Sequence, residues 1–489
     1  MAGLLTERIT DHAARAPGRV ALRSAGGDLD YAGLDSLAGR LAAALAAEGV
    51  GAGDRVAVRL GKSAGAVALF LAVLRLGAVH VPLNPDFTMR EAGAILSDAG
   101  PALVVTDTAG AGPLSSALPG LRVRDLARLR QAAETLAPVS GPGLTPDMPA
   151  AMLFTSGTTG RPKGAVLSHG NIAANLAALN GVWGITDTDT ILHVLPAFHA
   201  HGLFLGIGCL LMAGGAAILL DGFDADRVAA RLPEATVFMA VPAIYTRLLA
   251  HPGFDRAACR NLRLLTSGSA PLPAEVFAAI EARAGLAPVE RYGLTETIIL
   301  TSNPLRGPRR PGTVGLPLPG VDLRLADARD GVGRVEVRGP SVARDYWRAG
   351  PVVGPDGWFD TGDLGRLDAG GYLVLVGRSK DLIISGGYNV YPREVETVLE
   401  AMAGVEEAAV FGVPHPGFGE AVVAAVRGTA PEAELRAGLA AALAPYKRPK
   451  AILILDALPK NALGKVLRTE LRAAHAGLFG GEGGGEVVR

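Results

Sequence analysis

Helix-like segments alternate with short apolar segments in the first part of the chain, and this alternation restricts the fold more than any other feature. Leucines at helical spacing begin after Tyr31 and the pattern ends at Gly49. Strands that alternate with helices form parallel sheets covered by those helices, so the sequence predicts an α/β fold. The predicted helices are 31–48, 64–76 and 88–98, and the predicted strands are 56–58, 79–83 and 102–105.

The remaining sequence predicts further strands and a second domain. A chain of 489 residues exceeds one ordinary hydrophobic core, so two or more domains are expected. Residues 109–148 are rich in Ala and Pro and are expected to form an irregular connection. From residue 382 onward the pattern indicates a small separate domain. Later predicted helices are 171–179, 393–401 and 432–443, and later predicted strands are 191–195, 237–242, 262–265, 372–376, 405–413 and 421–426.

The charge and the cysteine content of the chain do not favour binding to nucleic acid, to an anionic membrane or to a metal cluster. Lys plus Arg equals Asp plus Glu at 47 each, so no electrostatic argument favours nucleic acid or an anionic membrane. The two cysteines, Cys209 and Cys259, make neither a disulfide framework nor a metal cluster, and buried thiols are expected. Residues 1–20 carry charges throughout and lack the apolar core of a signal peptide, so we expect a cytoplasmic protein.

Residues 202–220 contain no charged side chain and are long enough to span a bilayer. They include five glycines, among them the pair Gly214 and Gly215. A buried helix, a Gly-Gly turn and an inner strand at 216–220 explain this segment better than a membrane span.

Residues 155–164 combine glycines, hydroxyl groups and two cations, a composition that suits neither a helix nor a strand. Glycines allow the backbone to approach a polyphosphate, free N–H and hydroxyl groups donate to it, and cations offset its charge. The spacing differs from that of a Walker loop. The candidate ATP-binding residues of this loop are Thr155, Ser156, Gly157, Thr158, Thr159, Gly160 and Lys163.

Residues 154–164 resemble the phosphate loop of the adenylate-forming superfamily, which includes acyl-CoA synthetases, luciferases and adenylation domains. Further matches extend the resemblance from about residue 28 to about residue 472. It implies a large N-terminal domain of layered sheets with helices and a small mobile α+β C-terminal domain. The implied domains are 1–379, with the ATP and acyl sites, and 380–476, with a catalytic lysine, before a Gly-rich tail at 477–489 that is expected to be disordered.

The same resemblance implies the other nucleotide contacts. A small-residue segment after strand 262–265 would lie against the adenine, on which Tyr292 would stack. Thr295 would reach the α-phosphate, and the carboxylate of Glu296 would hold Mg²⁺. A capped helix start at Thr295 is the alternative for this segment. The further ATP-binding residues implied are Gly268, Ser269, Ala270, Tyr292, Gly293 and two ribose contacts, Asp363 and Arg378.

The chemistry that the resemblance implies is the activation of a carboxylic acid by ATP. Two anions, the carboxylate and the α-phosphate, must meet, so fixed positive charge is needed around them. In the family the C-terminal motif that matches residues 459–465 holds a mobile catalytic lysine, here Lys465, which would act with Thr295 and Glu296. Coenzyme A, the cosubstrate, would pass Gly386 and Gly387, and the hinge would be Lys380.

Arg291 precedes the nucleotide motif at a position that family geometry directs toward the acyl pocket. A cation there is costly to bury unless the substrate carries a second carboxylate. Arg291 together with His199 and Ser269 resembles malonyl-CoA synthetases, which implies a small dicarboxylic acid, malonate or methylmalonate, as substrate. The apolar residues 298–300 depart from that subfamily and leave open which malonate is used.

Several alternatives remain open from the sequence. Arg291 could pair with the neighbouring Glu290, and His201 is expected to be structural. Because no third ligand lies nearby, His199 and His201 do not indicate a metal site. A medium-chain or aryl acid, which the apolar residues 298–300 favour, could replace malonate, or the chain could be an adenylation module that loads a carrier protein.

Overall fold

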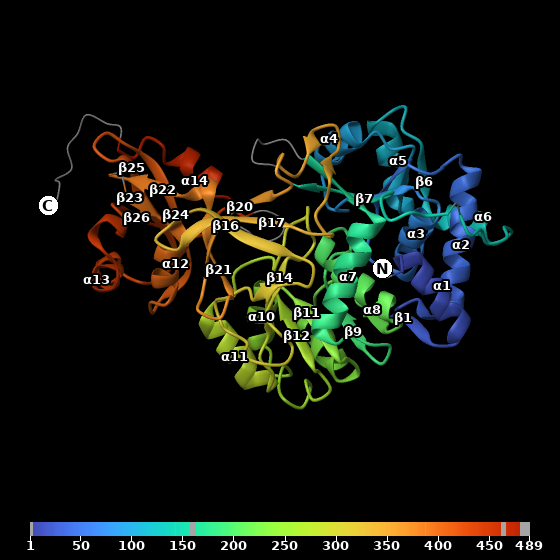
Figure 1. Ribbon diagram of the computed structural model, residues 1–489, viewed down its shortest axis with the longest axis horizontal. Coiled ribbons are helices and arrows are strands. Elements are labelled where there is room, and N and C mark those ends of the chain that lie inside the picture. The colour runs from blue at the N-terminus through green and yellow to red at the C-terminus, as the bar shows by residue number, and fades with distance from the viewer. Residues whose placement is uncertain (1–2, 142, 156–162, 387, 461–465, 480–489) are drawn as a thin grey trace. The chain divides into compact units, whose positions relative to one another are not determined.

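The computed structural model describes residues 3–141, 143–155, 163–386, 388–460 and 466–479 (Figure 1). The chain folds into two compact units, Met1–Leu323 with Val337–Phe359, and Arg324–Glu336 with Asp360–Arg489. This division assigns residues 360–379 to the second unit. The domain boundary expected between residues 379 and 380 therefore stays a prediction.

The first unit contains an eight-stranded sheet with the strand order β19-β18-β8-β7-β4-β3-β5-β6. Strand β3 pairs in parallel with β4 and β5, and each of the two crossovers contains one of the predicted helices. This confirms the α/β fold expected from the alternating pattern. The strands are β3 Arg55–Arg59, β4 Val79–Pro82, β5 Leu103–Thr106, β6 Val123–Asp125, β7 Pro149–Thr155, β8 Lys163–Ser168, β18 Asp345–Tyr346 and β19 Gly350–Pro351.

A nine-stranded sheet in the same unit has the order β15-β14-β13-β12-β11-β9-β10-β1-β2. Strands β9, β11, β12 and β13 pair in parallel, so their carboxyl ends lie at one edge, where loops can form a site. The strands are β1 Val20–Ser24, β2 Gly27–Asp30, β9 Thr190–His193, β10 Ala216–Leu219, β11 Val237–Ala240, β12 Leu264–Ser267, β13 Val289–Tyr292, β14 Thr301–Ser302 and β15 Leu316–Pro317.

The expectation of an irregular connection at 109–148 was wrong in its first half, where two helices flank strand β6. The side chain of Asp107 accepts a hydrogen bond from the backbone N–H of Gly110, and Asp125 accepts one from Ala127. These N-caps satisfy backbone donors that would otherwise be unpaired, so helices start despite the weak pattern. The helices before residue 140 are α1 Leu5–Arg15, α2 Tyr31–Ala47, α3 Ala64–Arg75, α4 Met89–Ala99, α5 Thr108–Ala117 and α6 Leu126–Ala133.

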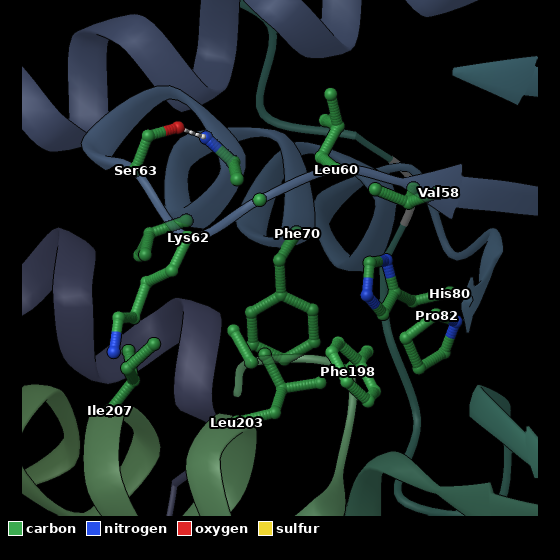
Figure 2. A pocket seen from close by; sticks show the side chains of 14 residues that line it. Val58, Leu60, Lys62, Ser63, Phe70, His80, Pro82, Phe198, Leu203 and Ile207 are labelled. Carbon is green, nitrogen blue, oxygen red and sulfur yellow. Dashed lines mark hydrogen bonds between the residues drawn. The ribbon is translucent and has the colours of Figure 1, made fainter. Parts of the chain in front are cut away.

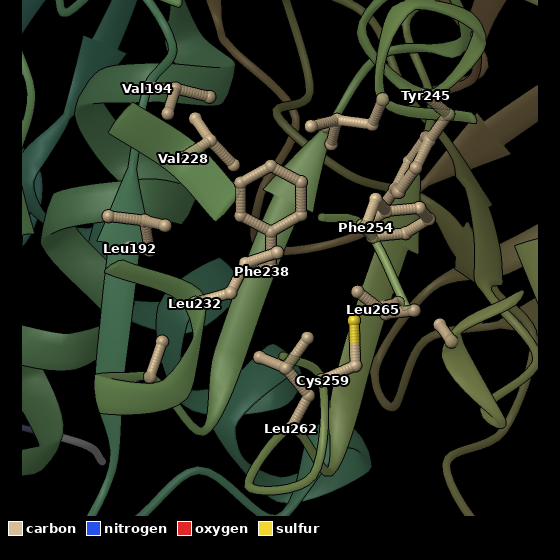
Figure 3. Close-up of a cluster of buried hydrophobic side chains, with 14 of the residues drawn as sticks. Leu192, Val194, Val228, Leu232, Phe238, Tyr245, Phe254, Cys259, Leu262 and Leu265 are labelled. Carbon is tan, nitrogen blue, oxygen red and sulfur yellow. The ribbon is translucent and has the colours of Figure 1, made fainter. Parts of the chain in front are cut away.

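Apolar side chains fill the space between the nine-stranded sheet and the helices α9 to α11 (Figure 3). The ring of Phe238 on β11 packs edge-on against Tyr245 of α10, with ring centroids 6.0 Å apart. The Tyr245 hydroxyl donates to the backbone oxygen of Thr266 at 2.9 Å, which ties α10 to β12 just before the predicted adenine segment. The later helices of this unit are α7 His169–Trp183, α8 Cys209–Ala213, α9 Ala225–Arg231, α10 Pro242–Leu249 and α11 Ala274–Ala284.

The uncharged segment 202–220 is buried inside the first unit, as expected. Residues His201–Gly208 form a π-helix, η1, which α8 continues up to the turn at Gly214 and strand β10. A Cβ atom on Gly202 would overlap the backbone oxygen of Pro196, so glycine is required there for η1 to pack against the segment that leaves β9. Among the described residues, no helix is long and apolar enough to cross a membrane.

The second unit contains a five-stranded sheet of β22 to β26 and most of a four-stranded sheet with the order β16-β17-β20-β21. A few residues at the strand ends of the four-stranded sheet belong to the first unit. Alternate residues of β24 belong to two apolar clusters, so this strand is buried on both faces. The elements are β16 Asp322–Arg329, β17 Val332–Arg338, β20 Phe359–Leu367, β21 Leu373–Arg378, η3 Ser379–Asp381, β22 Ile383–Ser385, β23 Tyr388–Val390, α12 Pro392–Glu400, β24 Val405–His415, β25 Gly419–Gly428, α13 Glu432–Ala442, η4 Pro445–Lys447, β26 Ala451–Ile454 and α14 Arg468–Ala474.

Candidate active site

Arg291 lies near the carboxyl end of β13 with its side chain inside the protein, where it is 5% exposed. Its guanidinium lies over Gly268, since a Cβ atom there would meet Arg291 Nη1 at 2.7 Å. Burial lowers the pKa of Arg291 to about 9, so the group keeps its charge at neutral pH. Among the described residues, no acidic side chain forms an ion pair with it. Its Nε also has no hydrogen-bond partner there.

Glu290 does not neutralise Arg291, so the alternative of an internal ion pair was wrong. Successive residues of a strand point to opposite faces, and the carboxylate of Glu290 accepts from the backbone N–H of Gly312 at 3.1 Å. Burial raises the pKa of Glu290 to about 8, which means that this carboxyl is protonated at neutral pH. The positive charge of Arg291 is therefore left for another partner.

The direct partner of Arg291 is His201, the first residue of η1. Arg291 Nη2 contacts His201 Nε2, and His201 Nδ1 lies 3.3 Å from the hydroxyl of Ser269. Burial holds the pKa of His201 well below its ordinary value, so the imidazole is neutral. Because a guanidinium only donates, Nε2 accepts and the proton is on Nδ1, from which it is donated to Ser269.

The predicted acid-binding residues are thus brought together only in part. Arg291 and Ser269 both contact His201, and Ser269 has a positive φ of 68° at the exit of β12. The ring of His199 packs against that of Phe198 with the centroids 4.5 Å apart and the planes tilted by 55°, and His199 lies two residues before the histidine that contacts Arg291. The sequence signal that could have marked His201 as a site residue is the spacing His-x-His next to a glycine. This spacing does not tell which of the two rings contacts Arg291, 90 residues away.

The nucleotide motif after β13 forms a turn and not the helix start that was the alternative. The backbone N–H of Leu294 donates to the hydroxyl of Thr297 at 3.1 Å within this turn. A Cβ atom on Gly293 would overlap the backbone of Ile298, so a glycine is needed where the chain folds back. Thr295 is half-buried in this turn, and Tyr292 and Glu296 are buried on either side of it.

The described ends of the glycine-rich loop lie beside Glu296. Thr155 and Lys163 are partners on the antiparallel strands β7 and β8, so the two ends are held together. The Lys163 ammonium lies 5.3 Å from the ring centroid of Tyr346, and the Tyr346 hydroxyl donates to Glu296 at 2.9 Å. Sequence reasoning missed Tyr346, because no motif marks it. The predicted residues Ser156, Gly157, Thr158, Thr159 and Gly160 lie outside the described residues.

Glu296 has the chemistry of a Mg²⁺ ligand. Its carboxylate is 8% exposed and is oriented by the phenol of Tyr346. Mg²⁺ in nucleotide sites is held by one or two carboxylates together with phosphate oxygens and water. One carboxylate beside the expected polyphosphate loop fits that donor set.

Predicted site residues also lie in the second unit, which is considered by itself. Asp363 of β20 and Arg378 of β21 are cross-strand partners and form an ion pair at 2.6 Å. Lys380 is exposed in the short helix η3, and the backbone N–H of Gly386 donates to the oxygen of Phe418 at 2.9 Å. Gly387 and Lys465 lie outside the described residues. The nucleotide, hinge and CoA roles of these residues stay predictions.

Known families match this arrangement of sheets and site residues. The model of the AMP-binding enzyme family matches residues 9–347, and the model of the AMP-binding enzyme C-terminal domain matches residues 394–465. The chain therefore belongs to the AMP-binding enzymes, the adenylate-forming superfamily that its motifs resemble. This confirms the expected fold, with a large N-terminal and a small C-terminal domain.

Individual relatives narrow the class to acid:CoA ligases. A feruloyl-CoA synthase of Amycolatopsis sp is 37% identical over 475 residues, 93% of this chain and 96% of that protein. A malonate–CoA ligase of Arabidopsis thaliana is 38% identical over 368 residues, 67% of this chain and 60% of that protein. The crystal structure of ATP-bound MatB from Rhodopseudomonas palustris has a TM-score of 0.93 and 41% identity, covering 98% of this chain and 100% of that chain.

Proposed function

We propose that this chain is an AMP-forming acid:CoA ligase whose substrate is a short dicarboxylic acid, malonate or methylmalonate. The observation that carries the proposal is the buried guanidinium of Arg291, which has no carboxylate partner among the described residues. A buried charge without a partner is strongly destabilising, and a second carboxylate on the substrate would supply the missing anion. The neutral His201 and Ser269 add hydrogen-bonding groups beside it.

The proposed reaction has two steps and needs no nucleophile from the protein. The acid carboxylate first attacks the α-phosphorus of ATP and expels pyrophosphate, which gives an acyl-adenylate. The thiol of coenzyme A then attacks the acyl carbon and expels AMP, which gives the thioester. Thr155, Lys163 and the loop between them would hold the phosphates, and Thr295 would contact the α-phosphate. Mg²⁺, when bound at Glu296, would offset the negative charge of the phosphates.

A second candidate is an aromatic acid:CoA ligase, because the similarity to a feruloyl-CoA synthase is as strong as that to a malonate–CoA ligase. The apolar residues Ile298, Ile299 and Leu300 were the sequence feature that favoured it. All three are buried, and the backbone oxygen of Ile299 accepts from the side chain of Asn175 at 2.7 Å.

A panel of acids tests the proposal directly. Purified protein is incubated with ATP, Mg²⁺ and malonate, methylmalonate, acetate, butyrate or ferulate, and AMP release is measured with and without CoA. We expect kcat/KM for malonate or methylmalonate to exceed that for butyrate by a factor on the order of 10³. Preference for ferulate or butyrate would contradict the dicarboxylate proposal, and AMP release independent of CoA would favour an adenylation module that loads a carrier protein.

A further inference from the structure

Lys62 connects the two sheets of the first unit at a point close to the acid site. It follows β3 and precedes α3, and its side chain extends toward Ile207 of η1 (Figure 2). Its ammonium lies 3.0 Å from Nδ1 of His193, 2.9 Å from the backbone oxygen of His193 and 2.9 Å from that of Leu195. Three donors of an ammonium thus face three acceptors, all at the end of β9.

These contacts assign the proton of the His193 ring. Burial lowers the pKa of His193 to about 3, so the imidazole is neutral. Because the backbone oxygen of Gly202 can only accept, Nε2 carries the ring proton and donates to it at 2.8 Å, which leaves Nδ1 to accept from Lys62. A Cβ atom on Gly206 would overlap the His193 ring, so the imidazole lies directly against the backbone of η1.

The connection from Lys62 therefore ends at the acid site. Gly202 adjoins His201, whose side chain contacts both Arg291 and Ser269. π-helices are rare and have poor intrinsic stability, so a hydrogen bond from outside the helix is important for the position of its first turn. Lys62 helps to line two cavities, of about 30 Å³ and about 290 Å³, and neither of them is lined by Arg291, His201 or Ser269. Lys62 therefore acts on the acid site through its hydrogen bonds and not by touching an acid bound there.

We propose that Lys62 is a positioning residue for acid selection, which acts through His193 and the Gly202 carbonyl on the His201–Arg291 pair. This inference rests on the proposed function, since it assumes that Arg291 and His201 bind the acid. It assigns a role in substrate choice to a residue of the loop between β3 and α3, outside every motif that marks the site in the sequence.

The first test replaces Lys62 with Met, which has a similar length but no donor. We expect KM for the preferred acid to rise about tenfold, with kcat and KM for ATP changed by less than about twofold. The matched control is Arg55→Met. Arg55 is the first residue of β3, the strand that precedes Lys62, and its side chain donates to the backbone oxygens of Ala99 and Gly100. This control should lower the melting temperature without changing KM for the acid.

The second test separates the two ring nitrogens of His193. A glutamine amide reaches as far as Nε2 and keeps a donor for Gly202, whereas an asparagine amide reaches only as far as Nδ1 and keeps the acceptor for Lys62. We expect His193→Gln to hold KM for the acid within about threefold of wild type, because a glutamine amide donates to Gly202 without needing Lys62 to keep a ring proton on Nε2. His193→Asn loses that donor and should raise KM as much as Lys62→Met does. Equal effects of the two substitutions would overturn the proposed connection.

A double-mutant cycle identifies the end of the connection. The effect of Lys62→Met on KM for the acid should disappear in an Arg291→Ala background, because a positioned group that is absent cannot be mispositioned. Additive effects, or a Lys62→Met variant that changes melting temperature but not KM, would overturn the inference. Failure of the proposed function is a distinct result, since wild type would then prefer a monocarboxylic acid in the panel, and the KM tests are run with whichever acid it prefers.

Discussion

At the scale of single residues, Arg291 combines charge with burial. A guanidinium that is 5% exposed and whose direct partner, within the part of the chain that the structure describes, is a neutral histidine loses hydration without gaining a counter-charge there. Enzymes tolerate such sites where the missing interaction comes from substrate. The free-energy cost of the unpaired charge then makes the enzyme select among acids, because an acid without a second carboxylate leaves the charge unpaired.

Arg291→Ala should remove most of the preference for dicarboxylic acids. We expect the ratio of kcat/KM for malonate to that for butyrate to fall by a factor on the order of 10², while KM for ATP stays unchanged. Arg291→Lys, which keeps the charge but not the planar fork, should lie between wild type and Arg291→Ala. A ratio that stays at the wild-type value in Arg291→Ala would contradict the role of the guanidinium.

The raised pKa of Glu290 predicts that the free energy of unfolding depends on pH. Its folded-state pKa of about 8 lies above the ordinary value of 4.5, so between these values the folded state holds a proton that the unfolded state lacks. The stability should therefore fall as pH rises through this window, by at most about 1.4 kcal/mol per pH unit, and level off above it. Urea unfolding at pH 6 and 9 should show the loss in wild type and a smaller one in Glu290→Gln; equal losses would contradict it.

At the scale of elements, the π-helix η1 packs closely against its neighbours at each of its glycines, Gly202, Gly206 and Gly208. His193, Pro196 and Leu176 all lie within reach of a Cβ atom that its glycines lack. Glycines therefore serve close approach here and not turn formation. The uncharged pattern of residues 202–220 predicted burial and a helix, but it could not predict the π geometry, which depends on what packs against these glycines.

Gly206→Ala should destabilise the protein by about 1–3 kcal/mol, because the added methyl group would overlap the His193 ring. Gly181→Ala is the matched control, since Gly181 lies in the exposed part of α7 with no atom within 4 Å of the new Cβ. There the substitution should stabilise by up to about 1 kcal/mol through helix propensity alone. Urea unfolding measures both, and a Gly206→Ala variant as stable as wild type would refute the packing argument.

At the scale of the whole molecule, the residues with predicted functions are distributed over both units. The described loop ends, Glu296 and the acid site lie in the first unit, whereas the Asp363–Arg378 pair and η3 lie in the second. Two half-reactions with different attacking groups are expected of such an enzyme. Lys380, exposed in η3, is the position at which the resemblance predicts backbone flexibility.

Lys380→Pro tests that prediction. Proline restricts the backbone at residue 380, so it should impair one half-reaction much more than the other. Acid-dependent exchange of pyrophosphate into ATP measures adenylate formation, and single-turnover conversion of the adenylate with CoA measures thioester formation. Lys380→Ala, which removes the side chain but keeps the backbone free, is the control. Equal loss of both half-reactions in the proline variant would count against a hinge at this position.

Long stretches of the fold could be predicted because they follow from local patterns. The alternation between residues 31 and 105 identified α2, α3 and α4 and the strands between them, since periodicity reports which face of an element is buried. Residues 109–148 could not be predicted, because α5 and α6 depend on the caps at Asp107 and Asp125 more than on an apolar face. A short helix that starts at a side-chain cap contains too few apolar residues at helical spacing to be recognised from the sequence.

The sequence by itself determined the class of chemistry, because a glycine-rich loop with the composition expected for binding phosphate and a carboxylate after a strand are local features with local causes. It also pointed to Arg291 as the cation that we propose to restrict the acid. Tertiary structure alone decided the partners: His201 instead of Glu290 for Arg291, Tyr346 for Glu296, and Lys62 for His193. Each of these pairs joins residues at least 50 positions apart, and only the packing of sheets and helices can set such distances.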